Sequence, residues 1–195
     1  MFDYIHRSKG KFSEYEQIHI AYEISVALKY LHSRNIIHCD LKSSNILIDD
    51  NWKIKIGDFG LSRFINKKNP SENSGRIGTP HWMAPEILKG GNYEESADVY
   101  SYGMILWEIL SLEIPYFGID PRKLMNIVAE ERKIVEVPKK GNVHIIKLTS
   151  QCLNYDPHKR PILKEIVDSL ESVLNQNKFN SKMTIILRYM YGGNS

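Results

Sequence analysis

The sequence is poor in cysteine and has no long hydrophobic run. Its 195 residues include only Cys39 and Cys152, and the segment from Met1 to Phe12 is too charged for a secretory signal peptide. We therefore expect no disulfide framework and a reducing, cytoplasmic location. The longest apolar stretch, Met104 to Leu112, is interrupted by Glu108 and is much shorter than a membrane span. It predicts a buried core helix, and no membrane partner is expected.

A strong charge of one sign is also absent. Lys and Arg outnumber Asp and Glu by 26 to 23, and the basic residues form only short clusters such as Lys67-Lys68 and Lys139-Lys140. Dispersed, nearly balanced charge is typical of a solvated surface, so we expect no nucleic-acid partner. The apolar content of 42% is sufficient for the core of a globular domain.

Two local patterns predict regular structure in the first third of the chain. Ser13-x-x-Glu16 has the form of a capping box, and apolar residues follow it at helical spacing, which predicts one long amphipathic helix. Further on, Ile46-Leu47-Ile48 and the alternating segment from Trp52 to Ile56 flank the turn-forming residues Asp49-Asp50-Asn51. This pattern predicts a β-hairpin.

The rest of the chain is predicted to be irregular and then helical. The stretch from Leu61 to Thr79 is polar and shows no period. Prolines from Pro80 to Pro161 then divide the chain into short helices, because proline removes a backbone donor and restricts the preceding residue. A final helix is predicted over Ile162 to Leu174. The predicted fold is therefore mainly α with a small β-hairpin.

Polar residues at the ends of the predicted hairpin suggest a metal and phosphate site. An antiparallel pair brings its open ends together, so Asn45 should lie near Asp58. An amide oxygen and a carboxylate suit Mg²⁺, which keeps several of its waters. Upstream, Asp40 and Lys42 are two residues apart in an extended segment, so both should point to one side. A carboxylate that orients a hydroxyl and an ammonium that meets phosphate charge are what phosphoryl transfer requires.

Three motifs follow one another in a characteristic order. His38-Cys39-Asp40-Leu41-Lys42-Ser43-Ser44-Asn45, then Asp58-Phe59-Gly60, then Ala84-Pro85-Glu86 resemble the catalytic loop, the magnesium-binding motif and the end of the activation segment of eukaryotic protein kinases. The resemblance runs from Phe2, in a segment similar to the one after the kinase hinge, to about Asn175. It implies that residues 1–177 form the C-terminal lobe of a kinase, with a tail of unassigned role at 178–195. It also implies ATP and Mg²⁺ as cofactors and a protein as substrate.

The resemblance assigns catalytic and binding roles to several residues. Asp40 and Lys42 match the catalytic aspartate and the phosphate-binding lysine of the loop. Asn45 and Asp58 match the residues that bind Mg²⁺ and, through it, the nucleotide. Leu47 would form the floor under the adenine ring.

Other residues correspond to structural supports of the kinase fold. His38 and Phe59 match positions in the hydrophobic spine of an active kinase, and Gly60 completes the magnesium-binding motif. Asp98 matches the residue that holds the catalytic loop by its backbone, and Arg160 matches the buried partner of Glu86.

The substrate class is indicated by a mixture of signals. Lys42 and Gly78-Thr79-Pro80 resemble the serine/threonine pattern, in which the threonine hydroxyl helps to seat the catalytic aspartate and lysine. The segment from Trp82 to Glu86 and the pair Trp107-Glu108 are more similar to tyrosine kinases. This mixture is typical of the tyrosine-kinase-like group, so we favour serine/threonine over tyrosine.

Two departures from the family pattern affect regulation and nucleotide binding. Cys39 replaces the arginine that pairs with a phosphate on the activation segment of many kinases. It either fills the space of that arginine or acts as a redox-sensitive thiol, and Arg63 is an alternative phosphate partner. Candidate phosphosites are Ser62, Ser71, Ser74 and Thr79. The second departure is that no Gly-x-Gly-x-x-Gly loop and no Val-Ala-x-Lys strand occurs, so the small lobe is missing from these residues.

Two hypotheses from different classes remain open. The chain is either the catalytic lobe of a kinase that needs a small lobe for activity, or a catalytically weak scaffold that binds partners. Retention of Asp40, Lys42, Asn45 and Asp58 favours the first hypothesis, and the missing lobe favours the second. In either case, exposed apolar side chains near Leu47 and Phe59 would offer a partner a docking face.

Overall fold

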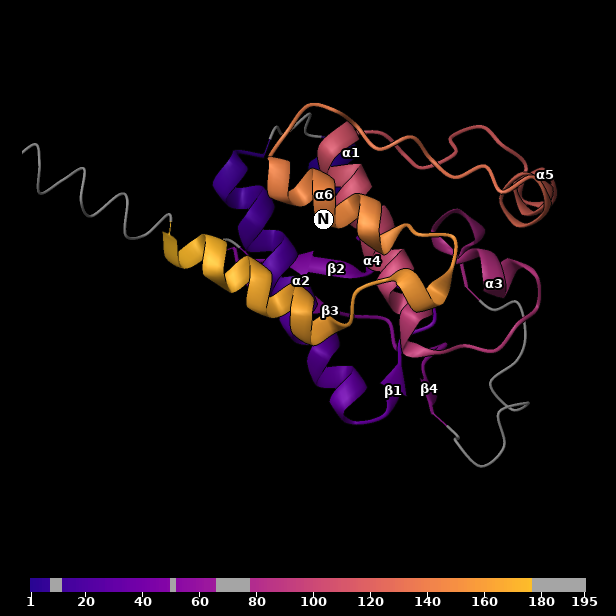
Figure 1. The fold of residues 1–195 in the computed structure, drawn as a ribbon, viewed down its shortest axis with the longest axis horizontal. Helices are drawn as coiled ribbons and strands as arrows, with labels where there is room; N and C mark the ends of the chain where they lie inside the picture. The colour runs from indigo at the N-terminus through magenta and orange to yellow at the C-terminus, as the bar shows by residue number, and fades with distance from the viewer. Residues whose placement is uncertain (8–11, 50–51, 66–77, 177–195) are drawn as a thin grey trace, which may run out of the picture.

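The computed structural model describes residues 1–7, 12–49, 52–65 and 78–176. Within these ranges the chain is mainly helical, with two small antiparallel sheets (Figure 1). No helix in these ranges is both long enough and apolar enough to cross a membrane. The predicted tail at 178–195 and the candidate phosphosites Ser71 and Ser74 lie outside the described residues.

The helix predicted from the capping box is α2, Glu14–Ser33. Ser13 accepts a hydrogen bond from the backbone N of Glu16 at 3.3 Å, and its own backbone N donates to Glu16 Oε2 at 2.7 Å. This reciprocal pair satisfies two amides that have no partner within the helix. The helix is preceded by the short helix α1, Phe2–His6.

The predicted hairpin is formed by β2, Ile46–Ile48, and β3, Ile54–Ile56. Its register pairs Ile46 with Ile56 and Ile48 with Ile54. The prediction that strand residues begin at Trp52 was wrong, because Trp52 has a φ of +60°, which is incompatible with a strand.

A second sheet was not predicted, and one of its strands lies in the segment from Leu61 to Thr79, for which the sequence predicted irregular structure. β1, Ile36–Ile37, pairs with β4, Arg63–Phe64. Two residues per strand are too few for alternation of polar and apolar residues to be recognised. The sheet fixes the start of the loop at residues 38–45 against the segment that follows Gly60.

The centre of the molecule is α4, Glu95–Ser111, in which every residue from Ala97 to Ile109 is buried. The stretch from Met104 therefore forms the expected core helix, although Leu112 lies beyond its end with a φ of +60°. Helix α6, Val143–Cys152, crosses α4 closely (Figure 1). A Cβ on Gly103 would lie 2.7 Å from the Cβ of Cys152, so only glycine allows this approach.

The remaining elements are short. They are the 3₁₀ turns Ser43–Asn45, Pro80–Trp82 and Pro157–Lys159, the helices α3 (Pro85–Leu88) and α5 (Pro121–Met125), the π-helical turn Asn126–Glu130, and a final helix over 163–176.

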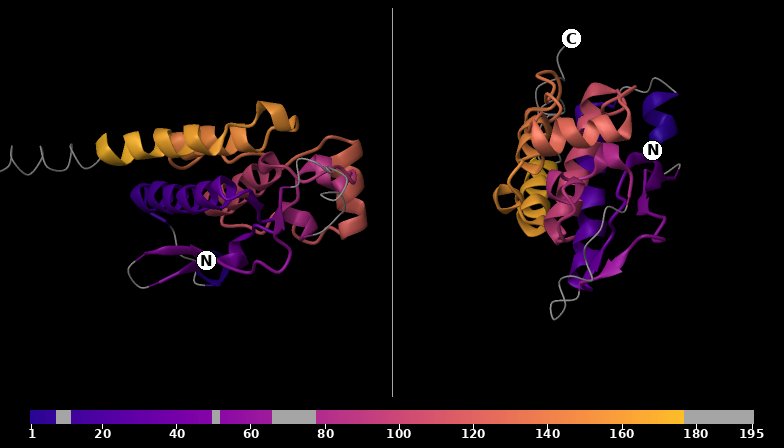
Figure 2. Two further views of the ribbon diagram at one scale, coloured as in Figure 1. Left: turned by 90° about the horizontal axis from the view of Figure 1, so that it is seen from below. Right: turned by 90° about the vertical axis from the view of Figure 1, so that its right-hand side faces the viewer.

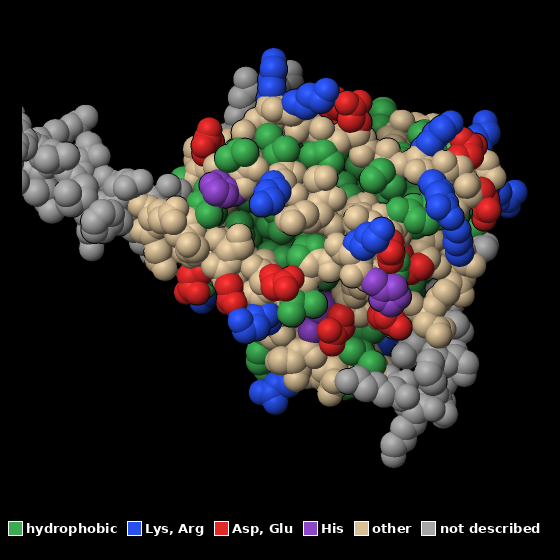
Figure 3. Space-filling model, viewed as in Figure 1, with side chains coloured by type: hydrophobic (Ala, Val, Ile, Leu, Met, Phe, Trp, Pro, Cys, Tyr) green, Lys and Arg blue, Asp and Glu red, His purple; other side chains and the backbone are tan. Residues whose placement is uncertain are grey.

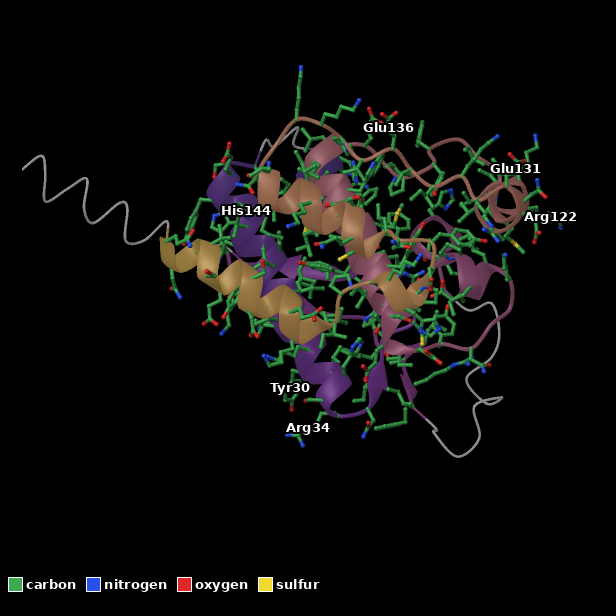
Figure 4. The ribbon with its side chains drawn as sticks, viewed as in Figure 1. Tyr30, Arg34, Arg122, Glu131, Glu136 and His144 are labelled. Atoms are coloured by element: carbon green, nitrogen blue, oxygen red, sulfur yellow. The ribbon has the colours of Figure 1, made fainter. Side chains whose placement is uncertain are left out.

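One part of the second half is not helical, contrary to the prediction. The segment from 131 to 142 contains no helix and includes Arg132 with a φ of +56° as well as Pro138 and Gly141. It is tied to α4 by a hydrogen bond from Trp107 Nε1 to the carbonyl of Glu136 at 2.8 Å. Figure 4 labels Glu136 on this segment, between α5 and α6.

The elements are arranged so that the two small sheets and the final helix lie on opposite sides of α2 (Figure 2). The space-filling view shows the face that carries α6 and the final helix, with acidic and basic side chains interspersed over it (Figure 3).

Candidate active site

The loop that follows β1 is held by one carboxylate from the core helix. Asp98 Oδ2 accepts a hydrogen bond from the backbone N of His38 at 2.8 Å, and Oδ1 accepts one from the backbone N of Cys39 at 3.1 Å. His32 Nε2 lies 2.9 Å from the same Oδ2. Cys39 has a φ of +65°, a conformation that costs a non-glycine residue about 1–2 kcal/mol. The hydrogen bonds to Asp98 offset this cost, and the expected contact between Asp98 and the loop backbone is present.

Asp40 and Lys42 meet Thr79 at the end of this loop. Lys42 Nζ lies 2.6 Å from Asp40 Oδ2 and donates to Thr79 Oγ1 at 2.8 Å. The backbone N and the hydroxyl of Thr79 both donate to Asp40 Oδ1, at 2.8 and 2.7 Å. The expected convergence of these three side chains is therefore present. It fixes both oxygens of a carboxylate that is only 8% exposed.

Asn45 supports Asp40 and faces the hairpin. Its Nδ2 donates to the carbonyl of Asp40 at 2.9 Å and lies 3.4 Å from Asp40 Oδ2. This use of the amide nitrogen leaves the amide oxygen as the group available to a cation. The backbone N of Gly57 donates to the carbonyl of Asn45 at 2.8 Å, which closes the hairpin beside Asp58.

The pair Asn45 and Asp58 suits a hard divalent cation. Asp58 is exposed, and its φ of +59° turns the chain away from the strand direction directly after the hairpin. One amide oxygen and one carboxylate form an incomplete ligand set, as expected for Mg²⁺, which retains waters and takes further oxygens from phosphates. The described residues contain no group of three or more His, Cys, Asp or Glu that could hold a metal, so a closed structural site is not formed among them.

Apolar side chains are exposed beside these polar groups. Leu47 is 58% exposed and Phe59 is 48% exposed. The ring of Phe59 lies 5.3 Å from that of His38, whose Nε2 is 3.0 Å from the carbonyl of Gly57. Gly60 follows, with its backbone N 3.5 Å from Asp58 Oδ1. The predicted exposure of an apolar surface around Leu47 and Phe59 is confirmed.

Glu86 and Arg160 form the expected ion pair away from the loop. Arg160 donates from Nη1 to Glu86 Oε1 at 2.6 Å and from Nη2 to Oε2 at 2.7 Å. Its Nε also donates to the carbonyl of Asn154 at 2.9 Å, and its guanidinium carbon lies 5.0 Å from the centre of the Tyr100 ring. The Arg160 side chain is fully buried, whereas that of Glu86 is 23% exposed. Bidentate geometry of this kind fixes the two segments relative to each other.

Cys39 fills a buried position and is not set up as a reactive thiol. Burial raises its pKa to about 12, and the neighbouring Asp98 carboxylate acts in the same direction. The nucleophilic thiolate is therefore scarce at neutral pH. Of the two interpretations of Cys39, this environment favours space filling. The alternative phosphate partner Arg63 places its guanidinium 5.9 Å from the centre of the Tyr93 ring.

Four residues have supporting roles that the sequence analysis did not assign. They are Ser43, Gly78, Trp82 and Tyr93. The Tyr93 hydroxyl donates to the carbonyl of Cys39 at 3.4 Å, and a Cβ on Gly78 would lie 2.6 Å from the same carbonyl. Gly78 also has a φ of +112°. Its position next to Thr79 was a usable signal, whereas nothing in the sequence links Tyr93 to Cys39.

Two other features do not belong to this site. A cavity of about 810 Å³ lies between the end of α2, the start of α4 and the segment from Pro157 to Lys164. Of the predicted site residues, only Arg160 lines it. Separately, Val26-Ala27-Leu28-Lys29 has the letters of the kinase lysine motif, but it lies within α2 and not on a strand. Lys29 therefore does not have the strand context of that motif.

Comparison with known proteins defines the class to which this fold and site belong. Residues 1–170 match the family model for protein tyrosine and serine/threonine kinases. The chain belongs to the protein kinase family.

Relatives of the chain are serine/threonine-protein kinases. The chain is 38% identical over 175 residues to the probable serine/threonine-protein kinase drkB of Dictyostelium discoideum, with 89% of this chain and 25% of that protein covered. It is 36% identical to the serine/threonine-protein kinase CTR1 of Arabidopsis thaliana, with 87% of this chain and 21% of that protein covered. For STY17 of the same plant the identity is 33%, with coverages of 90% and 30%. The chain thus spans less than a third of the length of these relatives.

Proposed function

We propose that this chain provides the catalytic lobe of a cytoplasmic protein kinase that transfers the γ-phosphate of ATP to serine and threonine hydroxyls of protein substrates. The observation that carries the proposal is the convergence of Asp40, Lys42 and Thr79 within 2.6–2.8 Å of one another. In phosphoryl transfer the protein contributes positioning and charge stabilisation more than covalent chemistry. A carboxylate and an ammonium fixed by a shared threonine provide both.

Each of these groups has a distinct role in the proposed reaction. Asp40 accepts a hydrogen bond from the substrate hydroxyl and orients its oxygen toward the phosphorus, in competition with the Thr79 hydroxyl that now contacts it. Lys42 is close enough to Asp40 to place its positive charge beside the transferred phosphoryl group. Asn45 and Asp58 would hold Mg²⁺, which neutralises phosphate charge when bound. Leu47 would lie under the adenine ring.

The serine/threonine class is supported by Lys42 and Thr79. The Thr79 hydroxyl bridges Lys42 Nζ and Asp40 Oδ1, and this is the arrangement expected from the serine/threonine pattern of the sequence. The relatives' names point in the same direction. Tyrosine is the alternative substrate class, and equal transfer to both types of hydroxyl would count for dual specificity.

We further propose that residues 1–177 form only the C-terminal lobe and need an N-terminal lobe for efficient transfer. Leu47 and Phe59 provide one apolar side for a nucleotide, and the sequence of residues 1–195 contains no Gly-x-Gly-x-x-Gly loop to cover its other side. The alternative function is that of a scaffold, in which the exposed surface around Leu47 and Phe59 binds a partner. That surface supports docking of an N-terminal lobe as well as docking of a separate protein.

A transfer assay with radiolabelled ATP tests these proposals. Residues 1–195 and the same residues fused behind a matching kinase small lobe would be incubated with Mg²⁺ and peptides that differ only in carrying serine, threonine or tyrosine. We expect little transfer from residues 1–195 and robust transfer to serine and threonine from the fusion protein. Asp40→Asn should lower the rate by about 10²–10⁴-fold without unfolding the protein, because it removes the hydroxyl-orienting group.

Controls distinguish the enzyme from the scaffold. Asp58→Ala should abolish transfer through loss of Mg²⁺, whereas Asp49→Ala removes an exposed-loop carboxylate outside the site and should leave the rate unchanged. Robust, Asp58-dependent transfer by residues 1–195 alone would show that no N-terminal lobe is needed. A folded fusion protein whose rate is unaffected by Asp40→Asn would overturn the catalytic proposal and favour the scaffold.

A further inference from the structure

The last turn of α4 contains an acidic side chain with no exposure to solvent. The Glu108 carboxylate is 0% exposed and is contacted by three groups from three separate segments. His6 Nε2 of α1 and the Ser43 hydroxyl approach Oε1 at 2.9 and 2.7 Å. Trp82 Nε1 donates to Oε2 at 2.7 Å. Each carboxylate oxygen therefore has at least one hydrogen-bond donor.

Stability alone does not explain a carboxylate at this position. Burying an ionised group costs several kcal/mol, and well-packed apolar side chains often stabilise a core equally well. Residues Met104 to Leu106 and Ile109 show that the part of α4 around Glu108 packs through apolar side chains. The carboxylate therefore has a role that depends on the groups it joins.

Two of the groups that Glu108 joins belong to the segments that carry Lys42 and Thr79. Ser43 follows Lys42 directly and begins the 3₁₀ turn that ends at Asn45. Trp82 ends the 3₁₀ turn that begins one residue after Thr79. The catalytic loop and the Thr79 segment are thus bridged twice. One bridge is the direct contact of Thr79 with Asp40, and the other passes from Ser43 through Glu108 to Trp82.

We infer that Glu108 is a positioning residue that fixes the orientation of the Thr79 segment against the catalytic loop. This inference rests on the proposed kinase function. The hydrogen bonds that join Thr79 to Asp40 and Lys42 attach the segment at one residue only, whereas a second attachment three residues further on, at Trp82, restrains its rotation. Ser101 adds to this restraint because its hydroxyl donates to the carbonyl of Trp82 at 2.9 Å. His6 attaches α1 to the same carboxylate.

Hydrogen exchange tests the bridge without requiring activity. Ser43→Ala removes one donor to Glu108, and exchange would be followed by mass spectrometry in the wild-type and variant full-length protein. We expect faster exchange at the backbone amides of Trp82 and Met83, in the segment that Glu108 joins to Ser43. These amides donate to the carbonyls of Thr79 and Pro80, respectively. Ser25→Ala is the matched control, since Ser25 is equally buried but its hydroxyl donates to the carbonyl of Tyr22 within α2. Unchanged exchange at residues 82 and 83 in Ser43→Ala would overturn the inference.

Kinetics then separate positioning from general stability. Trp82→Phe keeps the ring but removes the N–H, and we expect it and Ser43→Ala each to lower kcat several-fold with KM for ATP unchanged. Because both act through Glu108, the double variant should be little slower than the worse single variant. Glu108→Gln should retain most activity, since its oxygen accepts from Trp82 while its NH₂ donates to Ser43. Glu108→Leu should lower kcat by about 10²-fold.

The outcomes distinguish this inference from the proposed function. Multiplying effects in the double variant, or equal losses in Glu108→Gln and Glu108→Leu, would reject the bridge. The kinetics are measured on the protein fused behind a small lobe. If that fusion protein, without substitutions, transfers no phosphate, the proposed function fails, and the exchange experiment alone decides whether Glu108 links the two segments.

Discussion

Thr79 and Asp40, 39 residues apart in the sequence, are joined by two hydrogen bonds to the same oxygen atom. The Thr79 backbone N and its hydroxyl both end on Asp40 Oδ1, at 2.8 and 2.7 Å. The backbone bond persists whatever side chain occupies position 79, provided that the local fold is retained. The hydroxyl bond, together with the one from Lys42, depends on the side chain. The two contributions can therefore be separated by substitution.

Replacement of Thr79 by valine should lower activity while the fold is kept. Valine has the same shape but leaves Lys42 and Asp40 Oδ1 each without one partner. A hydrogen bond to a charged group contributes about 1.5–3 kcal/mol, so we expect kcat to fall by about 10- to 100-fold. Thr79→Ser retains the hydroxyl and should retain most of the rate. Equal rates for the serine and valine variants, measured with the same peptide, would show that the hydroxyl has no positioning role.

The Glu86 and Arg160 pair should affect stability asymmetrically. Glu86→Ala leaves the fully buried Arg160 guanidinium without its carboxylate and should lower the free energy of unfolding by about 3–5 kcal/mol. Arg160→Ala should cost less through charge, because Glu86 is partly exposed and regains water, although it also removes the bond to the Asn154 carbonyl. Urea unfolding of both single variants and the double variant provides the measurement. Midpoints that barely move in the single variants would contradict a buried pair.

Stability should decline at alkaline pH partly because of Cys39. Burial raises the pKa of this thiol from 9.0 to about 12, so the folded protein holds it neutral while the unfolded chain ionises at lower pH. The resulting stabilisation is fully present below about pH 9 and is lost as the pH rises toward about 12. The loss approaches about 1.4 kcal/mol per pH unit between these values.

Cys39→Ala isolates this contribution. Between about pH 8 and about pH 10.5, the free energy of unfolding should fall by more in the wild-type protein than in the variant. Cys152 is present in both proteins and contributes equally to the two changes. An identical pH dependence in the two proteins would mean that Cys39 titrates normally in the folded state.

Phosphorylation of the activation segment should have little effect through position 39. A thiol cannot donate the charged, bidentate hydrogen bond with which arginine binds phosphate. The full-length enzyme treated with phosphatase should therefore retain most of its activity. Arg63→Gln serves as a companion variant, because Arg63 is the alternative phosphate partner. If phosphatase treatment lowers the activity of the wild-type protein but does not lower that of Arg63→Gln, the phosphate-binding role belongs to Arg63.

The sequence predicted the structure well where local signals were strong. The capping box at Ser13 and the alternating residues around the turn at Asp49 produced α2 and the hairpin, because each signal is completed within a few residues. The pairing of Ile36 with Phe64 was missed since it joins residues far apart and involves two positions per strand. The helix expected in the segment 131–142 was also wrong, and its replacement depends on a contact with Trp107 that no local pattern encodes.

The candidate site was predictable to the extent that it resembles a known motif. Asp40, Lys42 and Thr79 were identified from the resemblance, and their contacts are present. Glu108 stood out as a charge within an apolar stretch and as part of the pair Trp107-Glu108, but neither signal named its partners. Its three partners come from α1, the catalytic loop and the segment after Thr79, and only the folded chain brings these together. A side chain that connects distant segments produces little recognisable pattern among its neighbours in the sequence.

The dependence of the catalytic loop on Asp98 has a consequence for synthesis on the ribosome. The acceptor for the His38 backbone N lies 60 residues further along the chain. At about 5–20 residues per second, some 3–12 s pass between the emergence of the loop and that of its acceptor. During this interval Cys39 has no carboxylate to hold its left-handed backbone, so the loop acquires its active shape only after the core helix has been made. A nascent chain stalled before residue 98 therefore contains every residue of the loop but cannot form its geometry.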